Sequence, residues 1–197
     1  MQKTPISLLE LVSRLENLMR AEFRRAGAGH GLQPVHIQAL LYVQQANRFS
    51  NTPQALAEYL GLTKGTVSQS LLLLDRRGLV ERYQDEMDKR VVRLRLSETG
   101  EGFLREANPG GLWNQATRDM SANRIRDSVS LLRSILHTLQ SQSGKPLFGV
   151  CGTCAYCQKK SQRITHCTWF GERLSIPETR KICREQTPKT SALTPVD

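Results

Sequence analysis

Five cysteines lie close together near the end of the sequence, and the 150 residues before them contain none. Two residues separate Cys151 from Cys154, a spacing that places two sulfurs on one side of a tight turn and is typical of a tetrahedral thiolate site. We expect Cys167 and Cys183 to complete a set of four metal ligands, with Cys157 as the substitute for one of them. A segment of about 40 residues with few apolar side chains needs such a metal cross-link, because it buries too little apolar surface to fold alone.

The spacing leaves the identity of the metal open between two alternatives. Zinc held by four thiolates is the ordinary structural solution. The run from Cys151 to Cys157 also resembles the start of a bacterial iron–sulfur ligand run, although the C-x-x-x-C-P that normally follows is missing. His166 is not an expected ligand, since four thiols suffice.

A second set of polar residues lies on a pair of short predicted helices. Thr52 and Pro53 suit the start of the first helix, Gly61 suits the turn after it, and Thr63 suits the cap of the next helix, which runs to about Arg77. Such a pair is a helix-turn-helix, whose second helix can lie in the major groove of DNA. The residues expected to meet phosphates or base edges are Thr63, Lys64, Gly65, Thr66, Ser68 and Gln69.

Two predicted strands, near 79–83 and 91–96, follow this helix pair and enclose a polar tip. The hairpin, or wing, carries the basic residues Arg82, Lys89, Arg90, Arg93 and Arg95. An arginine at the tip can enter the minor groove of DNA, where the potential is most negative. Asp88 is placed to orient the Arg90 guanidinium by a charge-assisted hydrogen bond. We therefore expect Lys89, Arg90 and Arg93 to contact DNA.

The remaining elements must hold these two sites. Apolar periodicity predicts a helix that starts at Thr4, another after Pro34, and a last one over about 121–140, while residues 108–111 must break the helix that follows the wing. The fold class is mainly α with a small β-wing, namely a winged helix-turn-helix with N- and C-terminal dimerisation helices and a small Cys-rich tail. The predicted divisions are 1–142 for the DNA-binding and dimerisation domain, 143–186 for the metal-binding module and 187–197 for a disordered tail.

The central residues resemble the MarR family of regulators. The segments that carry the resemblance are 56–63, 66–68, 74–80, 88–90 and 94–100. The resemblance implies a homodimer whose first and last helices form the dimer platform, and a palindromic double-stranded DNA operator, usually bound as a repressor. The interruption at Pro109-Gly110-Gly111 departs from the long continuous helix of the family. Many members bind small aromatic acids, but no residues here select such a ligand, so any effector is unknown.

Composition agrees with a DNA-binding protein of the cytoplasm. The net charge is +10, which favours polyanions as partners. No run approaches the roughly 20 apolar residues of a membrane span, so no membrane partner is expected. A cytoplasm keeps thiols reduced, and a disulfide framework is therefore not expected either. The thiolate centre is predicted to sense redox state, nitric oxide or iron. One alternative is a structural zinc module for a protein partner. A more remote alternative is a thiol oxidoreductase, although no set of catalytic residues indicates an enzyme.

Overall fold

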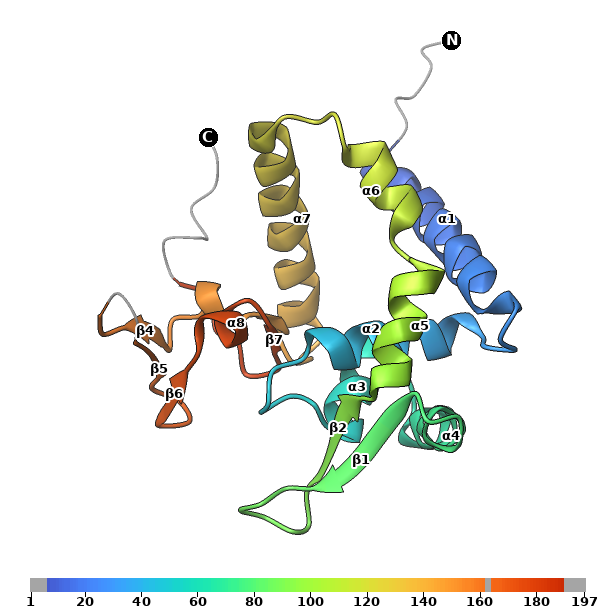
Figure 1. Ribbon diagram of the computed structural model, residues 1–197. Coiled ribbons are helices and arrows are strands. Elements are labelled where there is room, and N and C mark those ends of the chain that lie inside the picture. Colours follow the sequence, from blue (N-terminus) through green and yellow to red (C-terminus); the bar gives the residue numbers. More distant parts are fainter. Residues whose placement is uncertain (1–6, 162–163, 190–197) are drawn as a thin grey trace.

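A computed structural model describes residues 7–161 and 164–189. The long helices α1 and α7 and the short helix α6 stand above a winged-helix domain, and the C-terminal residues form a small module beside it (Figure 1). The elements are α1 (Leu8–Ala28), α2 (Pro34–Gln45), α3 (Pro53–Leu60), α4 (Lys64–Arg76), β1 (Val80–Gln84), β2 (Val92–Leu96), α5 (Glu98–Ala107), α6 (Gly111–Thr117), α7 (Ala122–Gln142), β3 (Gly149–Val150), a 3-10 turn (Cys151–Thr153), β4 (Cys157–Lys159), β5 (Thr165–Cys167), β6 (Glu172–Leu174), α8 (Ile176–Thr179) and β7 (Ile182–Cys183). This order confirms the predicted fold class.

The winged-helix domain is built from α2, α3, α4 and the β1–β2 hairpin. Its core consists of aliphatic side chains and Tyr42, and Leu40, Leu56 and Leu74 are fully buried. The two strands pair antiparallel, with Val80 opposite Leu96 and Gln84 opposite Val92. The ends of α3 and the start of α4 lie where they were predicted, because they are set by the caps Thr52 and Thr63 and by the left-handed turn at Gly61.

Helices α1, α6 and α7 form the part that stands above this domain in Figure 1. The predicted start of α1 at Thr4 lies outside the described residues; Ser7 is extended and its side chain accepts the Glu10 N–H, so the helix begins at Leu8. The predicted break after the wing is confirmed, since α5 ends at Ala107 and Asn108 has a φ of 42°. Neither α6 nor α7 has a buried residue, so these helices lack a full packing partner among the described residues.

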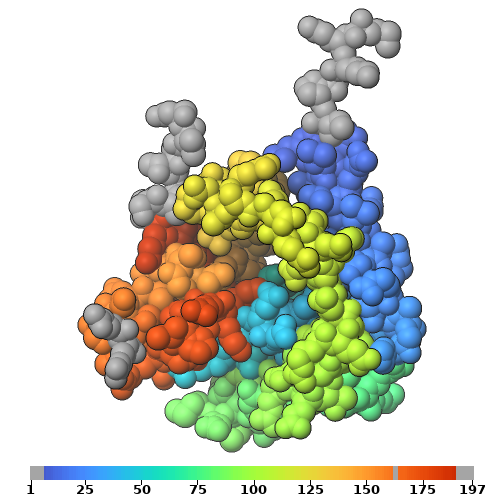
Figure 2. All heavy atoms as spheres, turned by 45° about the horizontal axis from the view of Figure 1, so that its top comes forward, coloured from blue at the N-terminus to red at the C-terminus, as the bar shows by residue number. Residues whose placement is uncertain are grey.

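The C-terminal module contains two small sheets, one of β3 and β7 and one of β4, β5 and β6. Figure 2 shows this orange and red module directly against the cyan segment around residue 50. The predicted boundary at 186 is too early, because the Thr187 carbonyl accepts the Ala155 N–H at 2.7 Å and Pro188 bridges to Cys154. The ordered module thus extends to at least Pro188, while the rest of the predicted tail from 190 onward lies outside the described residues.

None of the helices in the described residues is both long enough and apolar enough to cross a membrane.

Candidate functional site

Helix α4 exposes the polar face that the sequence predicted. Thr63 caps it: its Oγ1 accepts the Thr66 N–H at 3.1 Å and lies 2.9 Å from the Thr66 hydroxyl. The opposite face carries Val67, Leu71 and Leu74, each no more than 1% exposed. The six predicted reading residues, Thr63, Lys64, Gly65, Thr66, Ser68 and Gln69, are all exposed. The burial pattern therefore fixes which face of α4 is free to enter a groove.

The tip of the wing presents an oriented arginine. Asp88 accepts two hydrogen bonds from the Arg90 guanidinium, from Nε at 3.0 Å and from Nη2 at 3.1 Å, which is the arrangement predicted from the sequence. The Arg90 bond lowers the pKa of the Asp88 carboxyl, so the pair is charged at neutral pH. The Arg90 side chain nevertheless stays 90% exposed, and Lys89 beside it is exposed as well. Both side chains are thus available to a phosphate backbone.

Arg93, the third predicted wing contact, is engaged within the protein. Its Nε donates to Asp85 at 2.7 Å and its Nη1 to the Asn51 side chain at 3.4 Å, and only 16% of the side chain is exposed. The backbone N–H of Asp88, followed by the Arg93 bond, lowers the pKa of Asp85 to about 2. Arg93 therefore holds the base of the wing in place, which is a different task from that of Arg90.

The four predicted ligand cysteines are buried, and none of them forms a disulfide. Cys151, Cys154, Cys167 and Cys183 are each at most 8% exposed, and Cys157 is half-buried. Cys151 lies beside Cys183 and close enough to Cys157 for the charges to interact, while Cys157 lies opposite Cys167 in the β4–β5 register and close enough for the Cys154 charge to affect it.

The sulfur environments differ from one cysteine to the next, and burial raises the pKa of Cys157. Asn47 Nδ2 donates to Cys151 Sγ at 3.1 Å, and the Thr187 N–H donates to Cys154 Sγ at 3.4 Å. The hydrogen bond from Cys151, supported by Asn47, lowers the pKa of Cys183 to about 6 against the opposing effect of burial. The same hydrogen bond and burial raise the pKa of Cys151. The shared hydrogen bond thus acts in opposite directions on the pKa values of the two thiols.

Cysteine sulfurs are the ligands that zinc and iron–sulfur clusters prefer, but the structure does not gather them into one metal site. Within residues 7–161 and 164–189, no three Cys, His, Asp or Glu side chains gather into a group that could hold a metal ion. N–H donors to sulfur, as found here, are the usual support of a metal-bound thiolate. The four-thiolate metal site therefore stays a prediction.

The module is attached to the winged-helix domain by contacts that the sequence analysis missed. The Arg184 guanidinium binds both carboxylate oxygens of Glu58 on α3, with the Nη2 to Oε1 distance at 3.0 Å. Phe49 stacks on Phe170 with ring centroids 4.0 Å apart, and Phe148 is part of the domain core. The only local signal was the apolar Leu147-Phe148 pair directly after the expected linker.

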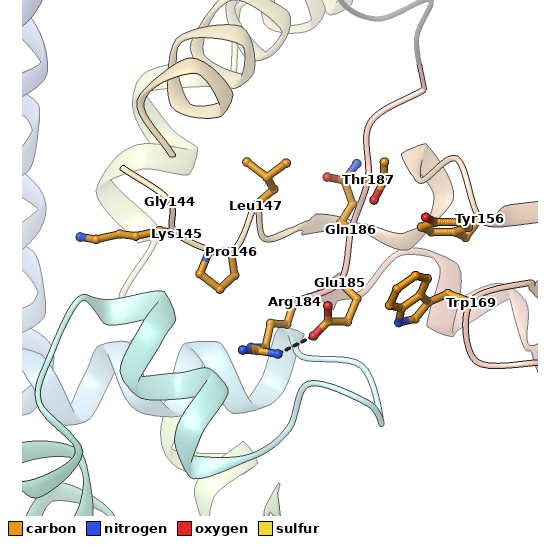
Figure 3. A pocket seen from close by; sticks show the side chains of 10 residues that line it. All are labelled: Gly144, Lys145, Pro146, Leu147, Tyr156, Trp169, Arg184, Glu185, Gln186 and Thr187. Atoms are coloured by element: carbon orange, nitrogen blue, oxygen red, sulfur yellow. Dashed lines mark hydrogen bonds and ion pairs between the residues drawn. The ribbon is translucent and has the colours of Figure 1, made fainter. Parts of the chain in front are cut away.

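A separate cavity of about 360 Å³ lies where the segment after α7 meets the module. Figure 3 shows Lys145 and Pro146 on one side, Tyr156 and Trp169 on the other, and Arg184 paired with Glu185 between them. No cysteine lines it, so it is distinct from the thiol groups. Arg184 is already bound to two carboxylates there, which leaves it little capacity to select an anionic ligand.

Comparison with known proteins agrees with this geometry. The profile of the MarR family matches residues 30–91, which span α2 to the end of the wing tip. This part of the chain is therefore similar to the MarR family. The chain is also similar to the transcriptional repressor MprA of Escherichia coli K12, with 26% identity over 104 residues, and to the HTH-type transcriptional repressor YetL of Bacillus subtilis, with 29% over 105 residues. These matches cover 53% of the chain but only 59% and 60% of the two repressors. As the matched relatives are regulators, they support the expectation that the chain is not an enzyme.

Solved structures show the same MarR fold at low sequence identity. CouR from Rhodococcus jostii, crystallised with p-coumaroyl-CoA, has a TM-score of 0.58 at 20% identity and covers 68% of this chain and 95% of its own. The MepR–DNA complex of S. aureus has a TM-score of 0.54 at 19% identity and covers 67% and 98%. About a third of this chain thus has no counterpart in either MarR-type structure.

Proposed function

We propose that the protein is a sequence-specific, double-stranded DNA-binding transcription regulator, a repressor that acts as a homodimer on a palindromic operator. One observation carries the proposal: an exposed polar face of α4 lies beside a wing whose tip presents Arg90, oriented by Asp88. The major groove accepts a helix with such a face, and the minor groove attracts an arginine. The similarity to two repressors and to a structure solved with DNA supports the same function.

The homodimer is proposed from the exposed apolar residues of α1 and α7. Leu9 and Leu18 on α1 and Leu131 and Leu139 on α7 are each more than half exposed. An apolar patch of this kind on helices without a packing partner is typical of a subunit interface. A two-fold dimer places the two α4 helices about one DNA turn apart, roughly 34–36 Å, which is why a palindrome is expected.

Selection from a pool of random DNA duplexes tests the proposal, because it requires no assumption about the operator sequence. We expect enrichment of an inverted repeat whose half-sites lie about 10 base pairs apart. Transcription from a promoter that carries the enriched site should then fall when the protein is added. A pool that shows no enriched sequence would contradict sequence-specific binding, and a rise in transcription would contradict repression.

We further propose that the module holds a metal through its thiolates, as zinc or as an iron–sulfur cluster. The reduced state of the buried thiols and the N–H donors to Cys151 and Cys154 support it. A cluster would make the protein a sensor of redox state, nitric oxide or iron. Purification without oxygen, followed by assays of iron, sulfide and zinc, separates the candidates: a brown protein with matching iron and sulfide indicates a cluster, and a colourless protein with one zinc per chain indicates a zinc module. Operator affinity that is equal with and without the metal would contradict sensing.

A purely structural module for another protein remains the second candidate. The contacts with Glu58 and with the α2–α3 loop favour a role inside the regulator instead. Removing the module after Gln142 discriminates the two: a docking module for a partner would be lost without any change in operator affinity.

A further inference from the structure

The cavity of about 360 Å³ beside the C-terminal module has a wall made of two aromatic rings (Figure 3). Tyr156 and Trp169 contact each other with ring centroids 5.1 Å apart and an angle of 40° between their planes. The Tyr156 carbonyl accepts the Thr168 N–H at 3.0 Å, so the turn that carries one ring holds the residue before the other. Trp169 nevertheless stays 55% exposed. Much of its indole ring is therefore free to stack on a ligand that enters the cavity.

A buried amide without a partner borders the same cavity. Gln186 lines the cavity and is only 7% exposed. Within the part of the chain that the structure describes, its side chain has no hydrogen-bond partner. Figure 3 shows the Gln186 amide pointing to the same side as the Leu147 side chain. Since buried polar side chains are nearly always hydrogen-bonded, this amide has an unused donor and an unused acceptor that a ligand in the cavity can reach.

The surrounding backbone holds the Gln186 amide in place. A Cβ on Gly149 of β3 would lie 2.8 Å from both Cδ and Oε1 of Gln186, so glycine leaves the room that the amide occupies. The next residue, Thr187, is fixed on both sides of its peptide: its N–H donates to Cys154 Sγ at 3.4 Å, and its carbonyl accepts the Ala155 N–H at 2.7 Å. The amide is thus oriented before a ligand arrives.

The charges around the cavity suit a ligand whose ring is neutral. Arg184 is paired with Glu185 in the wall and with Glu58 on α3, so these charges offset one another. Lys145 is exposed and forms no ion pair with any of the described residues. A negatively charged group attached to the ring would therefore find its partner at Lys145.

We propose that this cavity binds a purine nucleoside or nucleotide by its adenine ring. The ring stacks on Trp169, as bases stack on aromatic side chains in other proteins. The Gln186 amide pairs with the edge of the ring, because a glutamine amide matches the adjacent N6 amino group and N7 of adenine at two points. The volume of the cavity lies in the range of roughly 300–1,000 Å³ that small-molecule sites occupy. The inference goes beyond the proposed DNA-binding function and does not depend on it.

Isothermal titration of the full-length protein with adenosine tests the proposal. We expect saturable binding of one adenosine per chain. Purine riboside keeps the ring but lacks the N6 amino group, so it should bind about tenfold more weakly. Adenosine monophosphate distinguishes the two sources of the ring: tighter binding that is lost in Lys145→Ala assigns the site to a nucleotide, and equal or weaker binding assigns it to a nucleoside.

Two variants and a control locate the site. Gln186→Leu removes an amide that has no partner in the free protein, so the melting temperature should not fall. Its adenosine affinity should fall about tenfold, and its preference for adenosine over purine riboside should vanish. Trp169→Ala removes the stacking ring and should weaken both ligands about tenfold. The control Trp113→Ala removes another exposed indole, from α6 and outside the cavity lining, and should keep the affinity. If Gln186→Leu fails to fold, Trp169→Ala and the wild-type preference decide the question.

The outcomes separate the inference from the proposed function. A folded wild-type protein that binds neither adenosine nor adenosine monophosphate overturns the inference. Affinities that Trp169→Ala and Gln186→Leu leave unchanged place the ligand elsewhere and overturn this site. Equal binding of adenosine and purine riboside by the wild type overturns the role of Gln186. These titrations contain no DNA, so a protein for which no operator can be selected refutes only the proposed function.

Discussion

Replacing Arg90 by alanine tests the central feature of the DNA-binding surface. The structure presents a guanidinium that is 90% exposed and held by Asp88, so its removal costs the fold little. A homodimer carries two copies of Arg90, and each phosphate contact contributes about 0.9 to the slope of log affinity against log salt concentration. The variant should therefore lower that slope by about 1.8. Over a fourfold increase in salt, the affinity of the wild type should fall about twelvefold more than that of the variant.

The assay is a titration of the selected operator at several salt concentrations, followed by fluorescence anisotropy. Asp88→Asn is the matched variant: the arginine charge remains while its orientation is lost, so affinity should fall with the slope nearly unchanged. Arg105→Ala removes an exposed charge from the last turn of α5, outside the wing, and should change neither quantity. An Arg90→Ala variant with the wild-type slope would refute the assignment of this residue to the DNA backbone.

Three further predictions concern the platform, the module and an internal histidine. Leu136→Asp places a charge on the exposed apolar side of α7 and should convert the dimer to a monomer in analytical ultracentrifugation; an intact dimer would contradict the platform. Arg184→Met removes the bonds to Glu58, worth about 1 kcal/mol for a partly exposed charged pair, and should speed proteolysis of the module but not of α1. His36 accepts the Gln33 N–H at 3.0 Å, and burial lowers its pKa. The unfolded chain thus binds a proton first, and unfolding free energy should decrease as pH falls below about 6.5. In His36→Gln the slope near pH 6 should vanish, because carboxyls with lowered pKa values such as Asp85 add a slope only at more acidic pH; a slope near pH 6 that persists would assign it to another group.

The sequence predicted well wherever a structural feature depends on neighbouring residues. The caps at Thr52 and Thr63, the left-handed turn at Gly61 and the Asp88–Arg90 pair are all interactions across a few positions, and the structure contains each of them. Ser7 is likewise a short-range cap, because its side chain accepts the Glu10 N–H, while the predicted helix start at Thr4 lies outside the described residues.

Contacts between distant parts of the chain could not be predicted in this way. Asn47, Ser50 and Glu58 look like ordinary polar residues in the sequence, and their partners Cys151 and Arg184 lie 104 to 134 positions away. Periodicity carries no information about such pairs. Arg93 was expected to contact DNA because it alternates with apolar residues on a basic strand, but its orientation depends on Asp85 and Asn51, which only the folded hairpin brings beside it.

The C-terminal module contacts the DNA-binding domain directly, so its effect on that domain should not depend on dimerisation. Its polar bonds go to Glu58 on α3 and to the loop that holds the wing, which are parts of the DNA-binding domain. The exposed apolar faces of α1 and α7 lie on other elements. Energetic effects at sites that share no partners are expected to add within about 0.5 kcal/mol. Combining Arg184→Met with Leu136→Asp should therefore leave the faster proteolysis of the module in the monomer the same as in the dimer. A rate that differs between the two forms would mean that the platform also holds the module in place.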